Sequence, residues 1–173
     1  MNPTKKKGKK TVKNIRKIKK IQKIFARCEY EVDNTIYEKL YTALKGIKKQ
    51  DRTFFNFGSG IGEIAISISI LYPQIKQIVG IEFSKNKVKG ANKILKTLPQ
   101  CYNNKIKFTS SLNINLKDAN LIWISETEHL EKILEKINKE AKRDTYIFSE
   151  CPITMDRAEK AKNRYIYKMK ECL

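Results

Sequence analysis

Residues 53–70 read TFFNFGSGIGEIAISISI, and this stretch carries the strongest structural signal in the chain. Its aromatic start is typical of a buried strand, and the run from Glu63 to Leu71 predicts a helix. Between them stand Gly58, Gly60 and Gly62, which allow a sharp turn and let a ligand approach the main chain. Strand, glycine-rich turn and helix in this order predict a ligand-binding βα unit.

The next expected strand, residues 78–83, carries an acid close to its end. Glu82 stands twenty residues after Gly62. A carboxylate at the end of such a strand can accept two hydrogen bonds from a ribose diol. The helix N-terminus after the glycines offers free N–H groups to the same ligand. The alternative is a purely structural turn with a surface glutamate.

The rest of the chain alternates between expected helices and strands. Pro73 and Pro99 each end a helix, because proline cannot continue the helical hydrogen bonding. This alternation predicts an α/β sandwich with a mainly parallel sheet, and 173 residues suffice for one domain. The expected helices are residues 12–28, 35–47, 63–71, 86–98, 126–142 and 156–163, and the expected strands are residues 53–57, 78–83, 106–109, 121–125, 146–149 and 164–169.

The chain carries 37 Lys and Arg against 18 Asp and Glu, a net charge of +19, and the excess is concentrated at the start. Residues 1–30 hold ten Lys, two Arg and one acid, so we separate this basic tail and amphipathic helix from a folded domain, residues 31–173. Such a concentration favours a polyanionic partner, either nucleic acid, a nucleosome or an anionic membrane. The alternative is AT-rich coding, which enriches lysine. The candidate nucleic-acid contacts are Lys5, Lys6, Lys7, Lys9, Lys10, Lys13, Arg16, Lys17, Lys19, Lys20 and Lys23.

Several other classes of protein are excluded by the sequence. It has no run of eighteen apolar residues and no apolar segment behind its basic start, so we expect neither a membrane span nor a secretory signal. The isoleucine stripe of the amphipathic helix is expected to dock on the domain rather than on a membrane. The four cysteines are far apart and His129 is the one histidine. We therefore expect free thiols, no metal site and an intracellular protein.

The pattern N-x-G-x-G-x-G over residues 56–62 resembles motif I of the class I S-adenosylmethionine-dependent methyltransferases, which usually begin it with an acid. FFNFGSGIGEIAISIS followed by GIEFS is similar to the Dot-one-like histone lysine methyltransferases, whose pattern reads D-L-G-S-G-V-G-Q and then G-V-E. The resemblance covers roughly residues 33–155, through TIYE, LIWISETEHLEKILEKI and YIFSECPI. Small lysine methyltransferases of the ATP synthase c-subunit type are a neighbouring branch. The resemblance implies a Rossmann-like methyltransferase sandwich, preceded here by a basic helix.

The same resemblance implies how S-adenosylmethionine would be held. Asn56 would lie beneath the methionine moiety, Glu82 would hold the ribose and Phe83 would pack on the adenine. Ser111 and Leu112 replace an aspartate and a phenylalanine that contact the adenine in the family. The full set of expected cofactor residues is Asn56, Gly58, Ser59, Gly60, Glu63, Glu82, Phe83, Ser111 and Leu112.

At the acceptor end the chain departs from the family pattern. Ser125 stands where the family has an asparagine that lines the lysine channel. Glu126 follows it and is placed to draw in a lysine ammonium, although a helix dipole also favours an acid there. Methyl transfer to an amine is an in-line displacement that needs orientation and exclusion of water more than a dedicated base. Ser125 and Glu126 are therefore the candidate catalytic residues.

The resemblance implies a protein lysine N-methyltransferase that acts on a histone in the nucleosome. Its basic start would contact DNA, in a nucleus or a viral factory. The strand at 121–125 runs into SETE, which lacks the prolines and the aromatic of the N-P-P-Y tetrad found in amino-methylating enzymes of nucleic acids. The alternatives are a lysine methyltransferase of another protein and a degenerate methyltransferase fold that binds nucleic acid. The oligomeric state stays open.

Overall fold

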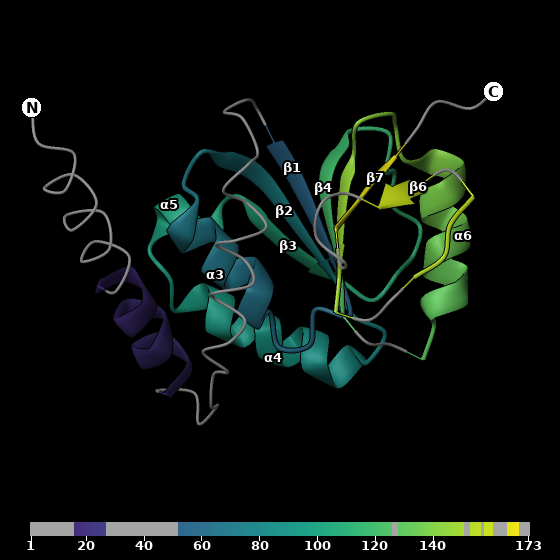
Figure 1. The fold of residues 1–173 in the computed structure, drawn as a ribbon. Coiled ribbons are helices and arrows are strands. Elements are labelled where there is room, and N and C mark those ends of the chain that lie inside the picture. Colours follow the sequence, from purple (N-terminus) through teal and green to yellow (C-terminus); the bar gives the residue numbers. More distant parts are fainter. Residues whose placement is uncertain are drawn as a thin grey trace, which may run out of the picture.

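The computed structural model describes residues 16–26, 52–125, 128–150, 153–156, 158–160 and 166–169. These residues form a seven-stranded sheet in the order β3-β2-β1-β4-β5-β7-β6, with helices on both faces (Figure 1). The predicted α/β sandwich with a mainly parallel sheet is therefore confirmed. The elements are a helix over residues 16–26, β1 (Arg52–Phe57), α3 (Glu63–Leu71), β2 (Ile75–Ile81), α4 (Lys85–Lys96), α5 (Gln100–Asn103), β3 (Ile106–Thr109), β4 (Ala119–Ile124), α6 (Leu130–Glu140), β5 (Tyr146–Ser149), β6 (Ala158–Lys160) and β7 (Ile166–Met169).

The order of the strands reverses beside β1. From β1 the sheet extends through β2 to β3 on one side and through β4 to β5 on the other, and these five strands are parallel. In this register Asn56 of β1 pairs with Gly80 of β2 and with Trp123 of β4. Such a reversal leaves a crevice at the carboxyl ends of the central strands, where ligands bind in open α/β sheets.

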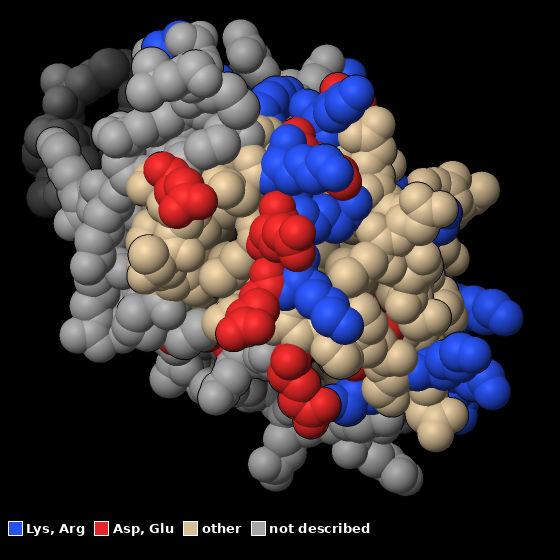
Figure 2. Space-filling model, turned by 90° about the vertical axis from the view of Figure 1, so that its right-hand side faces the viewer, with Lys and Arg blue, Asp and Glu red and all other residues tan. Residues whose placement is uncertain are grey.

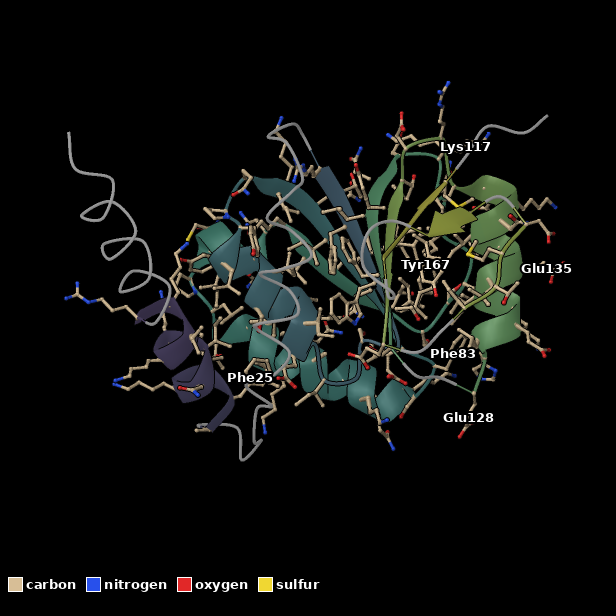
Figure 3. The ribbon with its side chains drawn as sticks, viewed as in Figure 1. Phe25, Phe83, Lys117, Glu128, Glu135 and Tyr167 are labelled. Atoms are coloured by element: carbon tan, nitrogen blue, oxygen red, sulfur yellow. The ribbon has the colours of Figure 1, made fainter. Side chains whose placement is uncertain are left out.

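One face of the sheet is covered by α3, α4 and the helix over residues 16–26 (Figure 1). Ile21 and Phe25 of that helix are fully buried, in the same core cluster as Ile94 of α4. Figure 3 shows Phe25 on the side of this helix that faces the domain. Full burial of an Ile or Phe side chain contributes roughly 1.5–3 kcal/mol. The predicted docking of the isoleucine stripe is thus found in the structure.

Two lysines of the helix over residues 16–26 also contact the rest of the domain. Leu71 is the last residue of α3, and its carbonyl accepts a hydrogen bond from the Lys17 ammonium at 3.1 Å. The Lys20 ammonium lies 5.0 Å from the centroid of the Tyr102 ring, which belongs to α5. The division predicted at residue 30 stays a prediction, but residues 16–26 pack as one unit with the sheet.

The opposite face is covered by α6 alone among the described helices. Ile133 and Ile137, one helical turn apart, are fully buried against Phe57 and Ile122. The loop before β4 also packs on this face through Leu116, which is fully buried. α6 therefore packs on this face against β1 and β4.

Of the two elements predicted near the C-terminus, one is confirmed and the other is wrong. A strand over residues 164–169 is confirmed for its described part, β7. A helix over residues 156–163 is wrong, because residues 158–160 form β6, which pairs antiparallel with β7. Strand pairing overrides a weak helical preference over so short a segment. The expected helix 126–142 begins later, at Leu130, and the expected helix 35–47 lies outside the described residues.

Candidate cofactor and acceptor site

The glycine-rich turn folds back against β2. Gly58, Gly60 and Gly62 all have positive φ angles, of 71°, 55° and 89°. The amide of Ser59 donates to the carbonyl of Ile81 at 2.9 Å, and the amide of Gly62 donates to the carbonyl of Ser59 at 2.8 Å. L side chains rarely adopt such φ angles, so this turn requires its glycines.

Two of the glycines make room for an aromatic ring, and a third faces open space. A Cβ at Gly62 or Gly80 would collide with the ring of Phe108, which is buried beside them. A Cβ at Gly60 would have no heavy atom of the described residues within 4 Å. Gly62 and Gly80 therefore serve packing, whereas the Gly60 backbone is left open to a ligand.

Glu82 joins the turn to the start of α4. One carboxylate oxygen, Oε2, accepts from the amide of Gly60 at 2.9 Å, and the other, Oε1, accepts from the amide of Ser84 at 2.9 Å. Ser84 in turn caps α4, its Oγ accepting from the amide of Lys87 at 3.4 Å. Each carboxylate oxygen can accept a second hydrogen bond. Glu82 is 9% exposed, so a ligand hydroxyl reaches it only at this edge.

Two buried oxygens beside the turn have no hydrogen-bond partner among the described residues. They are Oδ1 of Asn56, whose side chain is fully buried, and Oγ of Ser59. The Asn56 amide nitrogen makes a long contact of 3.4 Å with the carbonyl of Phe57. An unpaired buried polar atom costs about 1–3 kcal/mol. A ligand that brings hydrogen-bond donors to this point would remove that cost.

The three residues expected around an adenine lie on the α6 side. Phe83 packs edge to face on His129, with ring centroids 4.1 Å apart, and Figure 3 shows it near the start of α6. Leu112 is half-buried and joins the same apolar cluster as Phe83. Ser111 is exposed, and its Oγ accepts from the amide of Asn113 at 3.0 Å. Phe83 and Leu112 are thus brought together, and the Ser111 hydroxyl stabilises its own turn.

At the acceptor end, the candidate Ser125 sits beside the end of β1. Its amide donates to the carbonyl of Phe57 at 3.0 Å, and its side chain is half-buried. Glu126, the second candidate, lies outside the described residues. Glu63, expected to touch the cofactor, begins α3 directly behind the glycine turn.

Glu150 belongs to this edge and is absent from the sequence-based set. Its amide donates to the carbonyl of Ile124 at 3.0 Å, and its Oε1 accepts from the indole N–H of Trp123 at 3.3 Å. The Trp123 ring stacks on Phe148, with centroids 6.2 Å apart. Glu150 is the first residue after β5, just as Glu82 is the first after β2. The sequence contains part of this signal, an acid directly after the expected strand 146–149. The place of that strand beside β4 comes from the structure.

Of the predicted nucleic-acid contacts, five lie on the described helix over residues 16–26. Lys17 is half-buried, while Arg16, Lys19, Lys20 and Lys23 are exposed. The six that precede residue 16 lie outside the described residues.

Within the described ranges, no helix is long and apolar enough to cross a bilayer. The same residues contain no group of three or more His, Cys, Asp or Glu side chains that would suit a metal ion.

Comparisons with known proteins bear on the fold. No protein-family profile matches the chain, and no curated protein sequence matches it. Among solved structures, an RNA methyltransferase from Salinibacter ruber in complex with S-adenosyl-L-homocysteine is similar over 83% of this chain and 96% of that chain, with a TM-score of 0.59 and 17% identity.

Two further structures have the same architecture. Precorrin-6y C5,15-methyltransferase from Geobacter metallireducens is 16% identical over 66% of this chain, with a TM-score of 0.53. Geranyl diphosphate C-methyltransferase from Streptomyces coelicolor A3(2), in complex with Mg²⁺, geranyl diphosphate and S-adenosyl-L-homocysteine, is 15% identical over 66%, with a TM-score of 0.53. This chain spans 62% of the first and 44% of the second.

The chain therefore has the fold of the class I S-adenosylmethionine-dependent methyltransferases. The three neighbours act on an RNA, a precorrin and a diphosphate by their names. They do not distinguish the Dot-one-like branch from others, so that branch stays a prediction.

Proposed function

We propose that the chain is an S-adenosylmethionine-dependent methyltransferase whose acceptor is a protein lysine, on a histone in the nucleosome, with the basic start of the chain on DNA. The assignment of S-adenosylmethionine as cofactor rests on the two hydrogen bonds that the Glu82 carboxylate accepts. This carboxylate fixes the Gly60 amide and the turn before α4 together, at the strand-order reversal of a methyltransferase-like sheet.

The residues present fit this cofactor. Glu82 would accept from the two ribose hydroxyls, and the open Gly60 backbone would line the ligand. Among the residues that the structure describes, Asn56 Oδ1 and Ser59 Oγ have no hydrogen-bond partner, which suits a ligand that carries an ammonium group. When bound, S-adenosylmethionine supplies a methyl group on a sulfonium, which is already a good leaving group.

The acceptor half has to orient an amine and exclude water. Ser125 lies next to the end of β1, and Glu150 lies one strand further along the same edge. A carboxylate there attracts a lysine ammonium before the amine loses its proton to solvent. The sequence after β4 lacks the proline and aromatic tetrad that stacks a flipped base. Both points favour a lysine over a nucleobase.

RNA is the second candidate substrate. The chain spans 96% of the RNA methyltransferase from Salinibacter ruber, a fuller coverage than that of the other two neighbours. At 17% identity this similarity concerns the fold, so RNA enters as an arm of the experiment.

The experiment is methyl transfer from labelled S-adenosylmethionine to nucleosomes, free histones, naked DNA and RNA, side by side. We expect label on histone in the nucleosome arm and little elsewhere. Label on RNA or DNA would keep the cofactor assignment and overturn the substrate. Calorimetric titration with S-adenosyl-L-homocysteine is run in parallel, and failure of the chain to bind it would overturn the proposal at the cofactor.

A further inference from the structure

The outer surface of α4 carries a continuous stripe of cations. Lys85, Lys89, Lys93 and Lys96 recur at intervals of four, four and three residues, and all four are exposed. Such spacing aligns side chains along one side of a helix. The buried residues of α4, Ala91, Ile94 and Leu95, occupy its opposite side. We call these four lysines the α4 stripe.

The sequence that forms and directly follows α4 contains no acid. From Phe83 to Lys117 the sequence has no Asp or Glu, and residues 16–26 have none either. The helix over residues 16–26 packs on the same core cluster as α4 and exposes Arg16, Lys19 and Lys23. Neither of these two described segments therefore contains an acid that could pair with its own lysines.

The helix on the other face shows that solubility does not require such a stripe. α6 is also amphipathic, but it carries charged residues of both signs: Glu131, Lys132, Glu135, Lys136, Lys139 and Glu140. Figure 2 shows Lys and Arg side chains interleaved with Asp and Glu side chains over this part of the surface. The exposed side of α4 therefore has a charge that the fold itself does not demand.

We propose that the α4 stripe binds the phosphodiester backbone of a nucleic acid. The stripe is about 16 Å long at 1.5 Å per residue, which matches several successive phosphates of one strand. It begins at Lys85, just after the Ser84 amide that Glu82 holds. The nucleic acid would thus run from the rim of the cofactor site along α4. This extends, and rests on, the DNA contact in the proposed function.

A lipid surface fits these residues less well. A helix that lies on a membrane inserts an apolar side between its cations. The apolar side of the helix over residues 16–26 is used inside the domain, where Ile21 and Phe25 are fully buried. The apolar residues of α4 are likewise turned into the core. The exposed lysines of both helices therefore have no apolar side beside them that could enter a bilayer.

The test compares two double charge reversals in the full chain. Lys89→Glu/Lys93→Glu alters the α4 stripe, and Lys132→Glu/Lys139→Glu alters exposed lysines of α6. Both lower the net charge by the same amount. Binding to a fluorescent DNA duplex is measured by anisotropy over a range of salt concentrations. Calorimetry with S-adenosyl-L-homocysteine is run on every variant.

We expect the α4 variant to bind the duplex at least about tenfold more weakly, and its salt slope to fall by about 2, since each lost phosphate contact removes about 0.9. The α6 variant should stay within about twofold of the wild type, and cofactor affinity should not change. Equal losses in both variants, or none in either, would overturn the inference. Binding of the same variants to anionic vesicles is measured alongside, and an α4 variant that loses vesicle binding but keeps duplex binding would also overturn it. If duplex binding is lost in the α4 variant alone but the wild type binds no S-adenosyl-L-homocysteine, the methyltransferase proposal fails and the proposal for the α4 stripe stands.

Discussion

The carboxyl ends of the parallel strands form one edge of the sheet, and the two halves of this edge position their groups in different ways. At the β1–β2 half, the geometry is that of the backbone: three glycines with positive φ, and a glutamate that binds two amides. At the β4–β5 half, Ser125 and Glu150 are side chains on strand ends, and Glu150 is held through the indole of Trp123. Backbone geometry tolerates little change, whereas strand-end side chains can change without altering the fold. In the first half the three glycines and Glu82 match the motif I pattern, although Asn56 replaces its usual acid; in the second half Ser125 replaces the asparagine of the Dot-one-like pattern.

The largest effect is expected from Gly62→Val, which attacks the backbone half. The new side chain would collide with Phe108 and would require a φ of +89°. We expect the free energy of unfolding to fall by several kcal/mol, of the order of overpacking plus backbone strain, and Tm to fall by roughly 10 °C. Thermal unfolding followed by circular dichroism measures this.

Gly60→Ala is the matched control, because its Cβ enters open space and pays about 1–2 kcal/mol for the positive φ alone. Equal Tm losses in the two variants would refute a packing role for Gly62.

Next in size is Glu82→Ala, measured on cofactor affinity. The substitution removes the acceptor for the ribose and the tie to the Gly60 amide. Hydrogen bonds to a charged group are worth about 1.5–3 kcal/mol, so affinity for S-adenosyl-L-homocysteine should fall about 100-fold in calorimetry. Glu128→Ala removes an exposed acid and should bind normally. Normal binding by Glu82→Ala would show that the cofactor is held elsewhere.

Glu150→Gln tests the side-chain half. It keeps the shape and the acceptor for the Trp123 indole but removes the charge. We expect about a fivefold loss of methyl transfer, chiefly as a raised KM for the lysine substrate, since a partly exposed charge contributes about 1 kcal/mol. Cofactor affinity should stay unchanged. A parallel loss of cofactor affinity would place Glu150 in the backbone half instead.

The smallest effect is expected far from both halves, at the end of α6. The pKa of Glu140 is lowered from its ordinary 4.5: burial acts to raise it, but hydrogen bonds from Lys136 and from the amide of Leu116 outweigh that. A lowered folded-state pKa stabilises the protein above pH 4.5 and less as pH falls through the folded value. Glu140→Gln should cost less than about 1 kcal/mol at pH 7 and nothing near pH 2. Urea unfolding at both pH values measures this, and an acid-independent loss would contradict the ionic origin.

Local signals in the sequence sufficed for the backbone half. The turn around Gly60 and the acid at Glu82 follow from neighbours in the chain, so both could be placed before any tertiary contact was known. Glu150 could not be placed in the same way, because its importance depends on β5 lying parallel and next to β4. The contact of Phe83 with His129 likewise requires the return of the chain to α6. The helix expected at residues 156–163 was wrong because β7 offers a pairing partner that periodicity does not reveal.

The docking of the helix over residues 16–26 also has a consequence for folding during synthesis. Ile21 and Phe25 leave the ribosome early, but they pack with α4 and near Tyr102, which are synthesised much later. At about 5–20 residues per second, this apolar side waits for roughly 4–15 s without its partners. The lysines between the isoleucines keep the waiting segment charged. Because charges next to an apolar segment oppose aggregation, we expect these lysines to keep the nascent segment soluble until α4 is made.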